Sequence, residues 1–265
     1  TTRESIYRKL TDPSIRWEVR VDMLRRMKAE NLTPTDLDTL FDLLLNHQPA
    51  TGQQENWYVV ANEIMEQMRL QGIAPERYAQ TMLELMRDPA TSEVMRDYAV
   101  QHLGQWVTPR GTAHGHPHEQ NPAIIRETAE TIADLVTDPT HADTSVPGTS
   151  LMVLIDMQNG GVPDEIITPV IDSLNPWFTA TLAGTNRTNK ITRISAINAI
   201  GMLQLDTFRP TIRTLATDES ADPNLRLNSV AVLGMIGQPD DIQTLKTLAA
   251  TDTRFHYAAQ AALKK

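Results

Sequence analysis

Three histidines occupy alternate positions in one short segment: His114, His116 and His118, followed directly by Glu119. Neutral imidazole is a common ligand of zinc, copper and nickel, and Glu119 or the more distant His141 would supply a fourth ligand. The interleaved glycine and proline are also typical of a solvated turn that binds nothing. The sequence therefore leaves two interpretations open, a metal site on this loop and a plain loop, and we expect no bound ion unless one is added.

No other residues have the spacing of a catalytic centre. The chain has no cysteine, which excludes disulfides, thiolate nucleophiles and cysteine-ligated zinc. It has no Ser/His/Asp set and no paired-carboxylate motif. Gly160-Gly161 lacks the rest of a phosphate-binding loop, and Asp240-Asp241 simply opens a helix. We therefore predict no catalytic residues, no cofactor and no enzymatic activity.

The charge balance is acidic, with 24 Lys and Arg against 33 Asp and Glu and a net charge of −9. Nucleic-acid binding draws on clustered cations, so this balance argues against such a partner. The densest basic run, Arg20, Arg25, Arg26 and Lys28, is interrupted by acidic residues and is interpreted as a solvated helix face. Apolar runs are far shorter than the roughly 20 residues of a membrane-spanning helix, so we predict no membrane insertion.

A recurring turn signal separates the elements that would carry any site. Apolar, helix-periodic segments end in Leu-x-x-Asp or a related sequence at positions 12, 46, 88, 138, 185, 218 and 252, spaced by 34, 42, 50, 47, 33 and 34 residues. Several contain Asp-Pro, as at Asp12 and Asp88. Proline disfavours helix at the preceding residue, and aspartate can cap the helix that follows. The signal thus predicts turns between helices, and its period predicts stacked helical pairs.

After most of these turns comes a second pattern, Arg-x-x-small-x-x-x-apolar-Gly. Its arginines are Arg96, Arg193 and Arg226, and its glycines are Gly104, Gly201 and Gly234. We predict that the arginines are structural and bond an inter-helix aspartate or loop carbonyls. The small residue allows two helices to approach closely, and the glycine, just past the last periodic residue, suits a left-handed C-cap.

The last part of the chain shows how these helices would pack. The segment 224–236 is apolar on two sides, which predicts a helix packed between neighbours, and 240–250 has a single apolar stripe, which suits an outer helix. The final copy, 254–265, ends in Lys264-Lys265 and is expected to cap the array.

These motifs resemble HEAT repeats, particularly the short bacterial subtype that also occurs in phycobilin lyase subunits. The resemblance is strongest over 189–263 and extends to 78–106. It implies an all-α fold, a right-handed α-solenoid of about seven stacked helical pairs, in a single domain spanning residues 1–265. Insertions near 108–122 and 138–148 are expected to protrude as loops.

The repeats and the absence of catalytic motifs favour a scaffold that binds another protein or a peptide on the concave face of the solenoid, as a monomer. The alternatives are an accessory enzyme or chromophore-handling lyase subunit, and metal capture by the histidine loop. The chain starts at Thr1 without a leader, so it is either a processed or a trimmed form. Together with the absence of cysteine, this start favours an exported bacterial protein, periplasmic or secreted.

Overall fold

The computed structural model describes residues 6–109 and 121–264, and all regular structure in them is helical. Contacts divide the chain into two compact units. The first unit contains residues 1–132 and 156–167, and the second contains residues 133–155 and 168–265. No helix in the described residues is long and apolar enough to cross a membrane.

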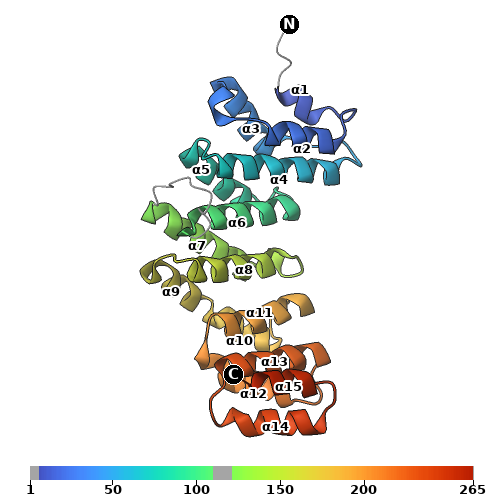
Figure 1. The fold of residues 1–265 in the computed structure, drawn as a ribbon, viewed down its shortest axis with the longest axis vertical. Helices are drawn as coiled ribbons and strands as arrows, with labels where there is room; N and C mark the ends of the chain where they lie inside the picture. The colour runs from blue at the N-terminus through green and yellow to red at the C-terminus, as the bar shows by residue number, and fades with distance from the viewer. Residues whose placement is uncertain (1–5, 110–120, 265) are drawn as a thin grey trace. The chain divides into compact units, whose positions relative to one another are not determined.

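The first unit is built from helices in consecutive pairs (Figure 1). In each pair the helix that comes first along the chain is called the first helix and the other the second helix. The first helices pack on one another, α1 on α3 and α3 on α5, and so do the second helices, α2 on α4 and α4 on α6. The first unit therefore has two layers, one of first helices and one of second helices. The elements are α1 (Ile6–Thr11), α2 (Trp17–Arg25), a 3-10 turn (Ala29–Asn31), α3 (Pro34–Asn46), α4 (Gln54–Leu70), α5 (Pro75–Arg87) and α6 (Glu93–Val107).

Three helices lie at the division and contribute residues to both units: α7 (Pro122–Thr137), α8 (Val146–Asn159) and α9 (Asp164–Ser173). The insertion expected at 138–148 is shorter than predicted. A 3-10 turn, Pro139–His141, follows α7, and α8 already begins at Val146. Most of the insertion expected at 108–122 lies outside the described residues.

The second unit repeats the two-layer arrangement. The second helices α11, α13 and α15 pack on one another in that order, while α12 packs on α13 and α14. As predicted, α13 is packed between neighbours, and its Leu233 is fully buried. The elements are α10 (Asn175–Ala183), α11 (Lys190–Met202), a 3-10 turn (Asp206–Phe208), α12 (Arg209–Thr217), α13 (Pro223–Ile236), α14 (Asp241–Thr251) and α15 (His256–Ala262).

The predicted turns all occur, and aspartate closes five of them in the same way. At Asp12, Asp88, Asp138, Asp218 and Asp252 the side-chain Oδ1 accepts a hydrogen bond from the amide two residues on, at 2.8–3.0 Å. The carbonyl accepts from the amide three residues on, at 3.0–3.1 Å. Of the predicted aspartate caps, Asp222 caps the following helix α13, whereas the carboxylates of Asp12 and Asp88 are used within their own turns and do not cap the next helix.

Other residues cap the helices after the turns. Ser92, Asn189 and Asp222 accept a hydrogen bond from the first turn of α6, α11 and α13, respectively. At α3, Thr33 and Asp36 form a reciprocal capping box. Each cap satisfies amides that have no partner within the helix, which fixes where the helix begins.

Candidate functional site

The histidine cluster cannot be placed, because His114, His116 and His118 lie outside the described residues, as does Glu119. His141 lies beside Asp138, with Nε2 3.8 Å from Oδ2. Within 6–109 and 121–264 no group of three or more His, Asp or Glu side chains is placed to hold a metal ion. Metal binding by this loop stays a prediction.

The arginines of the repeat pattern reach back to the end of the preceding helix. Arg96, on α6, donates from Nε to the carbonyl of Met86 at 3.1 Å and from Nη2 to that of Asp88 at 2.7 Å. The last carbonyls of a helix have no partner within it and carry its negative dipole end, so a buried guanidinium both satisfies and neutralises them. Arg96 thus fixes the angle between α5 and α6.

The same contact occurs twice in the second unit. Arg193 donates to the carbonyls of Thr181 and Leu182, both at 3.1 Å. Arg226 donates to the carbonyl of Ala216 at 3.4 Å. Each bond joins a second helix to the first helix of its own pair, so these arginines position the second helices and leave the opposite side of each helix free for other contacts.

Arg20 makes the same contact and was missed at the sequence level. It is 4 % exposed and donates from Nη1 to the carbonyl of Leu10 at 3.1 Å. Burial lowers the pKa of its guanidinium, and the nearby Asp12 opposes that change. The interpretation of Arg20 as part of a solvated face was therefore wrong. Its spacing was the signal, since it follows the turn at 12 by eight residues, as Arg96 follows the turn at 88.

The glycines of the pattern do not end helices, so the C-cap prediction was wrong. Gly104, Gly201 and Gly234 lie inside α6, α11 and α13, which continue to residues 107, 202 and 236. None of them has a positive φ. The left-handed cap occurs instead at Gly184, with φ 69°, at the end of α10.

Two of these glycines allow consecutive second helices to approach closely. A Cβ at Gly201 would lie 3.0 Å from both the Met235 sulfur and the Val232 Cγ2 on α13. A Cβ at Gly234 would lie 2.4 Å from the Ala262 Cβ on α15. A side chain at either position would occupy space that the neighbouring helix already fills, which is a requirement of packing and not of backbone conformation.

Large apolar side chains that remain exposed are concentrated on second helices. Tyr7 on α1 and Ile242 on α14 are the examples on first helices. A contiguous patch of such side chains would mark a surface that contacts other molecules. The examples on second helices, and on α8, are Val19, Val59, Val94, Met152, Ile191, Met202, Leu227 and Tyr257.

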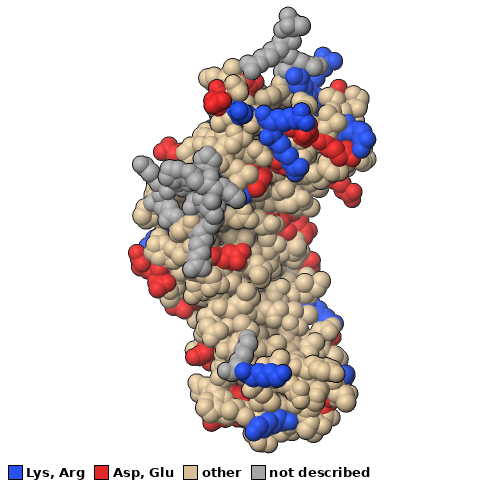
Figure 2. All heavy atoms as spheres, viewed as in Figure 1, with Lys and Arg blue, Asp and Glu red and all other residues tan. Residues whose placement is uncertain are grey.

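In the second unit this surface carries no acidic residue. No Asp or Glu occurs within α11, α13 or α15, although the whole chain has a net charge of −9. Figure 2 shows a largely uncharged surface over α10 to α13 on the face in view. We call this surface the second-helix face; its apolar members are Ile191, Ile194, Met202, Leu227, Met235 and Tyr257.

Two sets of residues on this face occupy equivalent repeat positions, and the first set includes the polar Asn224. Ile191 and Tyr257 lie 33 residues before and after Asn224, and all three are exposed, Ile191 to 75 % and Tyr257 to 82 %. Met202 and Met235 form a second set with the same spacing. Because α11 packs on α13 and α13 on α15, these sets form rows across adjacent helices.

The first unit contains a buried polar cluster between α4 and α6. Glu66 Oε2 lies 2.7 Å from Arg69 Nη2 and 3.3 Å from His102 Nδ1, and His102 Nε2 lies 2.8 Å from Asn62 Oδ1. The contacts with His102 and Arg69 outweigh burial and lower the pKa of Glu66 to about 2. The carboxylate is thus ionised under ordinary conditions, and the cluster holds two second helices together.

Tyr78 of α5 is completely buried near this cluster, and burial raises the pKa of its phenol. Its hydroxyl has no hydrogen-bond partner among the described residues. A neutral phenol in such a site is a packing residue, and none of the cluster's residues lines either the cavity beside α1 and α2 or the one beside Trp57. The cluster is therefore read as a structural link.

Comparison with known families agrees with this repeat geometry in the second unit. Residues 178–264, from within α10 to the end of the described chain, match the family model for HEAT repeats. HEAT repeats commonly form protein-interaction scaffolds. No curated protein matches the chain significantly. The resemblance to the phycobilin-lyase subtype remains a prediction.

Proposed function

We propose that this protein is a non-enzymatic scaffold that binds a protein or peptide on the second-helix face of α11, α13 and α15. The observation that carries the proposal is the exposure of Ile191, Leu227 and Tyr257, one large apolar side chain on each of these helices, without any acidic residue within the helices. Burial of such side chains by a partner is favourable at about 25 cal/mol per Å² of apolar surface. The proposal includes three further statements. About seven helical pairs form a right-handed solenoid, the second-helix face lies on its concave side, and the protein is a monomer.

The partner is expected to present apolar side chains spaced along one side of a helix or extended segment. The two cations at the start of α11 are already engaged. Lys190 pairs with Asp222 at 2.8 Å, and Arg193 is bonded to carbonyls. The face therefore offers contact area and amide groups such as Asn198 and Asn228, and little charge, to a ligand. Specificity would come from the fit of apolar anchors into the rows.

The test begins with selection of a displayed random peptide library on the intact chain. The affinity of a selected peptide is then measured by fluorescence anisotropy for the wild type and for the double variant Ile191→Asp/Leu227→Asp. We expect at least about a tenfold loss of affinity, because two buried apolar anchors are replaced by charges. Both side chains are exposed, so the variant should fold normally.

Ile242→Asp is the matched control, since Ile242 is exposed to 44 % but lies on the first helix α14. It should leave peptide affinity unchanged. Equal binding by the wild type and the double variant would contradict the proposal, as would a loss confined to Ile242→Asp. Sedimentation over a range of concentrations completes the test: self-association abolished by the double variant would make the face a contact between copies and overturn the monomeric scaffold.

A further inference from the structure

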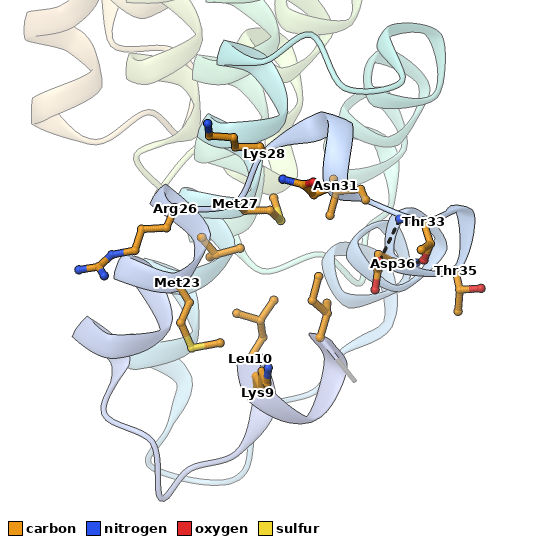
Figure 3. Close-up of a pocket in the computed structure, with 13 residues that line it drawn as sticks. Lys9, Leu10, Met23, Arg26, Met27, Lys28, Asn31, Thr33, Thr35 and Asp36 are labelled. Carbon is orange, nitrogen blue, oxygen red and sulfur yellow. Dashed lines mark hydrogen bonds between the residues drawn. The ribbon is translucent and has the colours of Figure 1, made fainter. Parts of the chain in front are cut away.

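A separate cavity lies at the start of the first unit, between α1, α2 and the beginning of α3 (Figure 3). Its volume is about 480 Å³, which falls within the range of small-molecule sites in proteins. Its walls are mainly apolar: Ile6, Leu10, Met23, Leu24, Met27 and Leu32. In Figure 3 the Met23 and Met27 side chains lie on either side of the space above Leu10.

Cations surround this apolar space. Lys9, Arg26 and Lys28 contribute to the lining. Arg26 pairs with Asp22 at 2.9 Å, whereas neither Lys9 nor Lys28 has an ion pair or side-chain hydrogen bond within residues 6–109 and 121–264. Lys9 is only half-exposed. A partly buried ammonium without a counter-charge is unfavourable, so an anion at this position would be stabilising.

The wall also contains a carboxylate, Asp36, which is part of the cap of α3. Asp36 Oδ2 accepts hydrogen bonds from the Thr33 amide at 2.9 Å and from its hydroxyl at 2.7 Å. The sequence around the cavity is also more basic than the chain as a whole. Residues 6–36 carry seven Lys and Arg against five Asp and Glu, whereas the whole chain carries 24 against 33. Figure 2 shows Lys and Arg gathered over this end of the chain.

We propose that the cavity binds a single-chain amphiphile, with its aliphatic chain against Met23, Met27 and Leu10 and its carboxylate or phosphate head against Lys9 or, in the reverse orientation, Lys28, which lie at opposite ends of the cavity (Figure 3). Methionine side chains are flexible and polarisable and adapt to an irregular aliphatic ligand. The lysines act as mobile point charges that suit either head group. This site is independent of the second-helix face.

Calorimetric titration tests the proposal with dodecanoate and dodecyl phosphate, each below its micellar concentration. Dodecanol has the same chain without charge, and acetate and inorganic phosphate have the charge without the chain. We expect the two anionic amphiphiles to bind, dodecanol to bind at least about tenfold more weakly, and the small anions not to bind measurably. Binding of dodecanol as tight as that of dodecanoate would overturn the role of the lysines.

Variants locate the site. Lys9→Gln/Lys28→Gln should weaken dodecanoate binding about tenfold or more, and Met23→Gln/Met27→Gln should do the same through the chain. The controls are Lys246→Gln, an exposed lysine on α14, and Met152→Gln, an exposed methionine on α8. Circular dichroism checks that each variant is folded. Unchanged affinity in both cavity variants would overturn the assignment, as would tighter binding of an acidic leucine-rich hexapeptide, which would identify a peptide-docking surface instead.

Discussion

In both units the same arginine contacts position the second helices, which we call the arginine framework. The contacts between one second helix and the next differ between the units. Arg20 and Arg96 in the first unit, and Arg193 and Arg226 in the second, all bond the carbonyl end of the preceding helix. Aspartate turns recur in both units. The contacts between one second helix and the next are nevertheless of two kinds.

In the first unit these contacts are polar. Arg25 of α2 pairs with Glu63 of α4 at 3.0 Å, and Glu66 of α4 contacts His102 of α6. Gln71, just after α4, donates to the carbonyl of Met27 at 3.0 Å. Such links specify which groups must face one another, and they place charge on the helices that carry them.

In the second unit small residues make the close contacts, beside an ion pair at 2.8 Å between Lys190 of α11 and Asp222 at the start of α13. Gly201 lies against Val232 and Met235, and Gly234 lies against Ala262. No acidic residue occurs on α11, α13 or α15, which leaves these helices without negative side chains. The comparison teaches that the arginine framework sets the positions of the helices, while the choice between polar links and close packing decides what surface remains for a partner.

The largest expected effect tests the close packing of α13. Leu233→Ala should lower the free energy of unfolding by about 2–5 kcal/mol, because Leu233 is fully buried and its truncation leaves a cavity. Leu227→Ala, 38 % exposed on the same helix, is the control and should cost about 1 kcal/mol or less. Urea denaturation followed by circular dichroism measures both, and similar small losses would argue against tight packing of α13.

The next effect tests whether the framework is common to both units. Arg20→Met should cost about 1–3 kcal/mol, because it leaves the Leu10 carbonyl without its buried donor. Arg226→Met should cost a similar amount through the Ala216 carbonyl. Arg16→Met, at an exposed surface pair, should be nearly neutral. If Arg20→Met left the free energy of unfolding unchanged while Arg226→Met lowered it, the arginine framework would stabilise the second unit alone.

Two equivalent glycines should respond differently to the same change. Gly234→Ala places a Cβ 2.7 Å from the Ala262 Cα, so α15 must shift, at a cost of about 1–3 kcal/mol. Gly201→Ala meets only side chains, and the flexible Met235 can move while the helix gains about 1 kcal/mol in propensity. We therefore expect a change near zero. Equal destabilisation of the two variants in thermal unfolding would refute the distinction.

Local chemistry explains what the sequence predicted correctly. The turn positions 12, 88, 218 and 252 each fall one residue after a helix end, at residues 11, 87, 217 and 251. Turn chemistry is set by the aspartate and its next three residues, so it is readable without the fold. The helical pairs and the buried side of α13 followed from the same periodicity.

What the sequence did not predict depends on contacts between distant residues. The role of Gly234 requires knowing that Ala262 faces it, and Glu66 and His102 are 36 positions apart in a region where the repeat spacing is irregular. The concave surface expected from the sequence included the segments 96–105, 191–201 and 225–234, and the last two lie in α11 and α13. The lack of acidic residues on the second-helix face could have been read from the segments 190–202, 223–236 and 256–262 once their helices were known.

The smallest effect concerns acid, and it should be confined to the first unit. The pKa of Glu66 is about 2, below its ordinary value of 4.5, so its stabilising contribution is present above about pH 4.5 and is lost as the pH falls towards 2. The side chain is about one-third exposed, and solvent screening reduces the contribution to about 1–2 kcal/mol.

Glu66→Gln tests this contribution, with Glu55→Gln at an exposed position of the same helix as the control. Urea unfolding at pH 6 should show the wild type more stable than Glu66→Gln, and the difference should shrink towards pH 3. The turn carboxylates Asp12, Asp218 and Asp252, whose pKa values are also lowered by their hydrogen bonds, are common to both proteins and cancel in the difference. Hydrogen exchange should place the acid-induced loss that differs between the two proteins in α4 and α6, because Asp222, which caps α13 and whose pKa is lowered by Lys190, is the same in both. Parallel stability curves for the two proteins from pH 6 to pH 3 would mean that the Glu66 cluster does not hold the first unit's second helices together, and that packing alone suffices in both units.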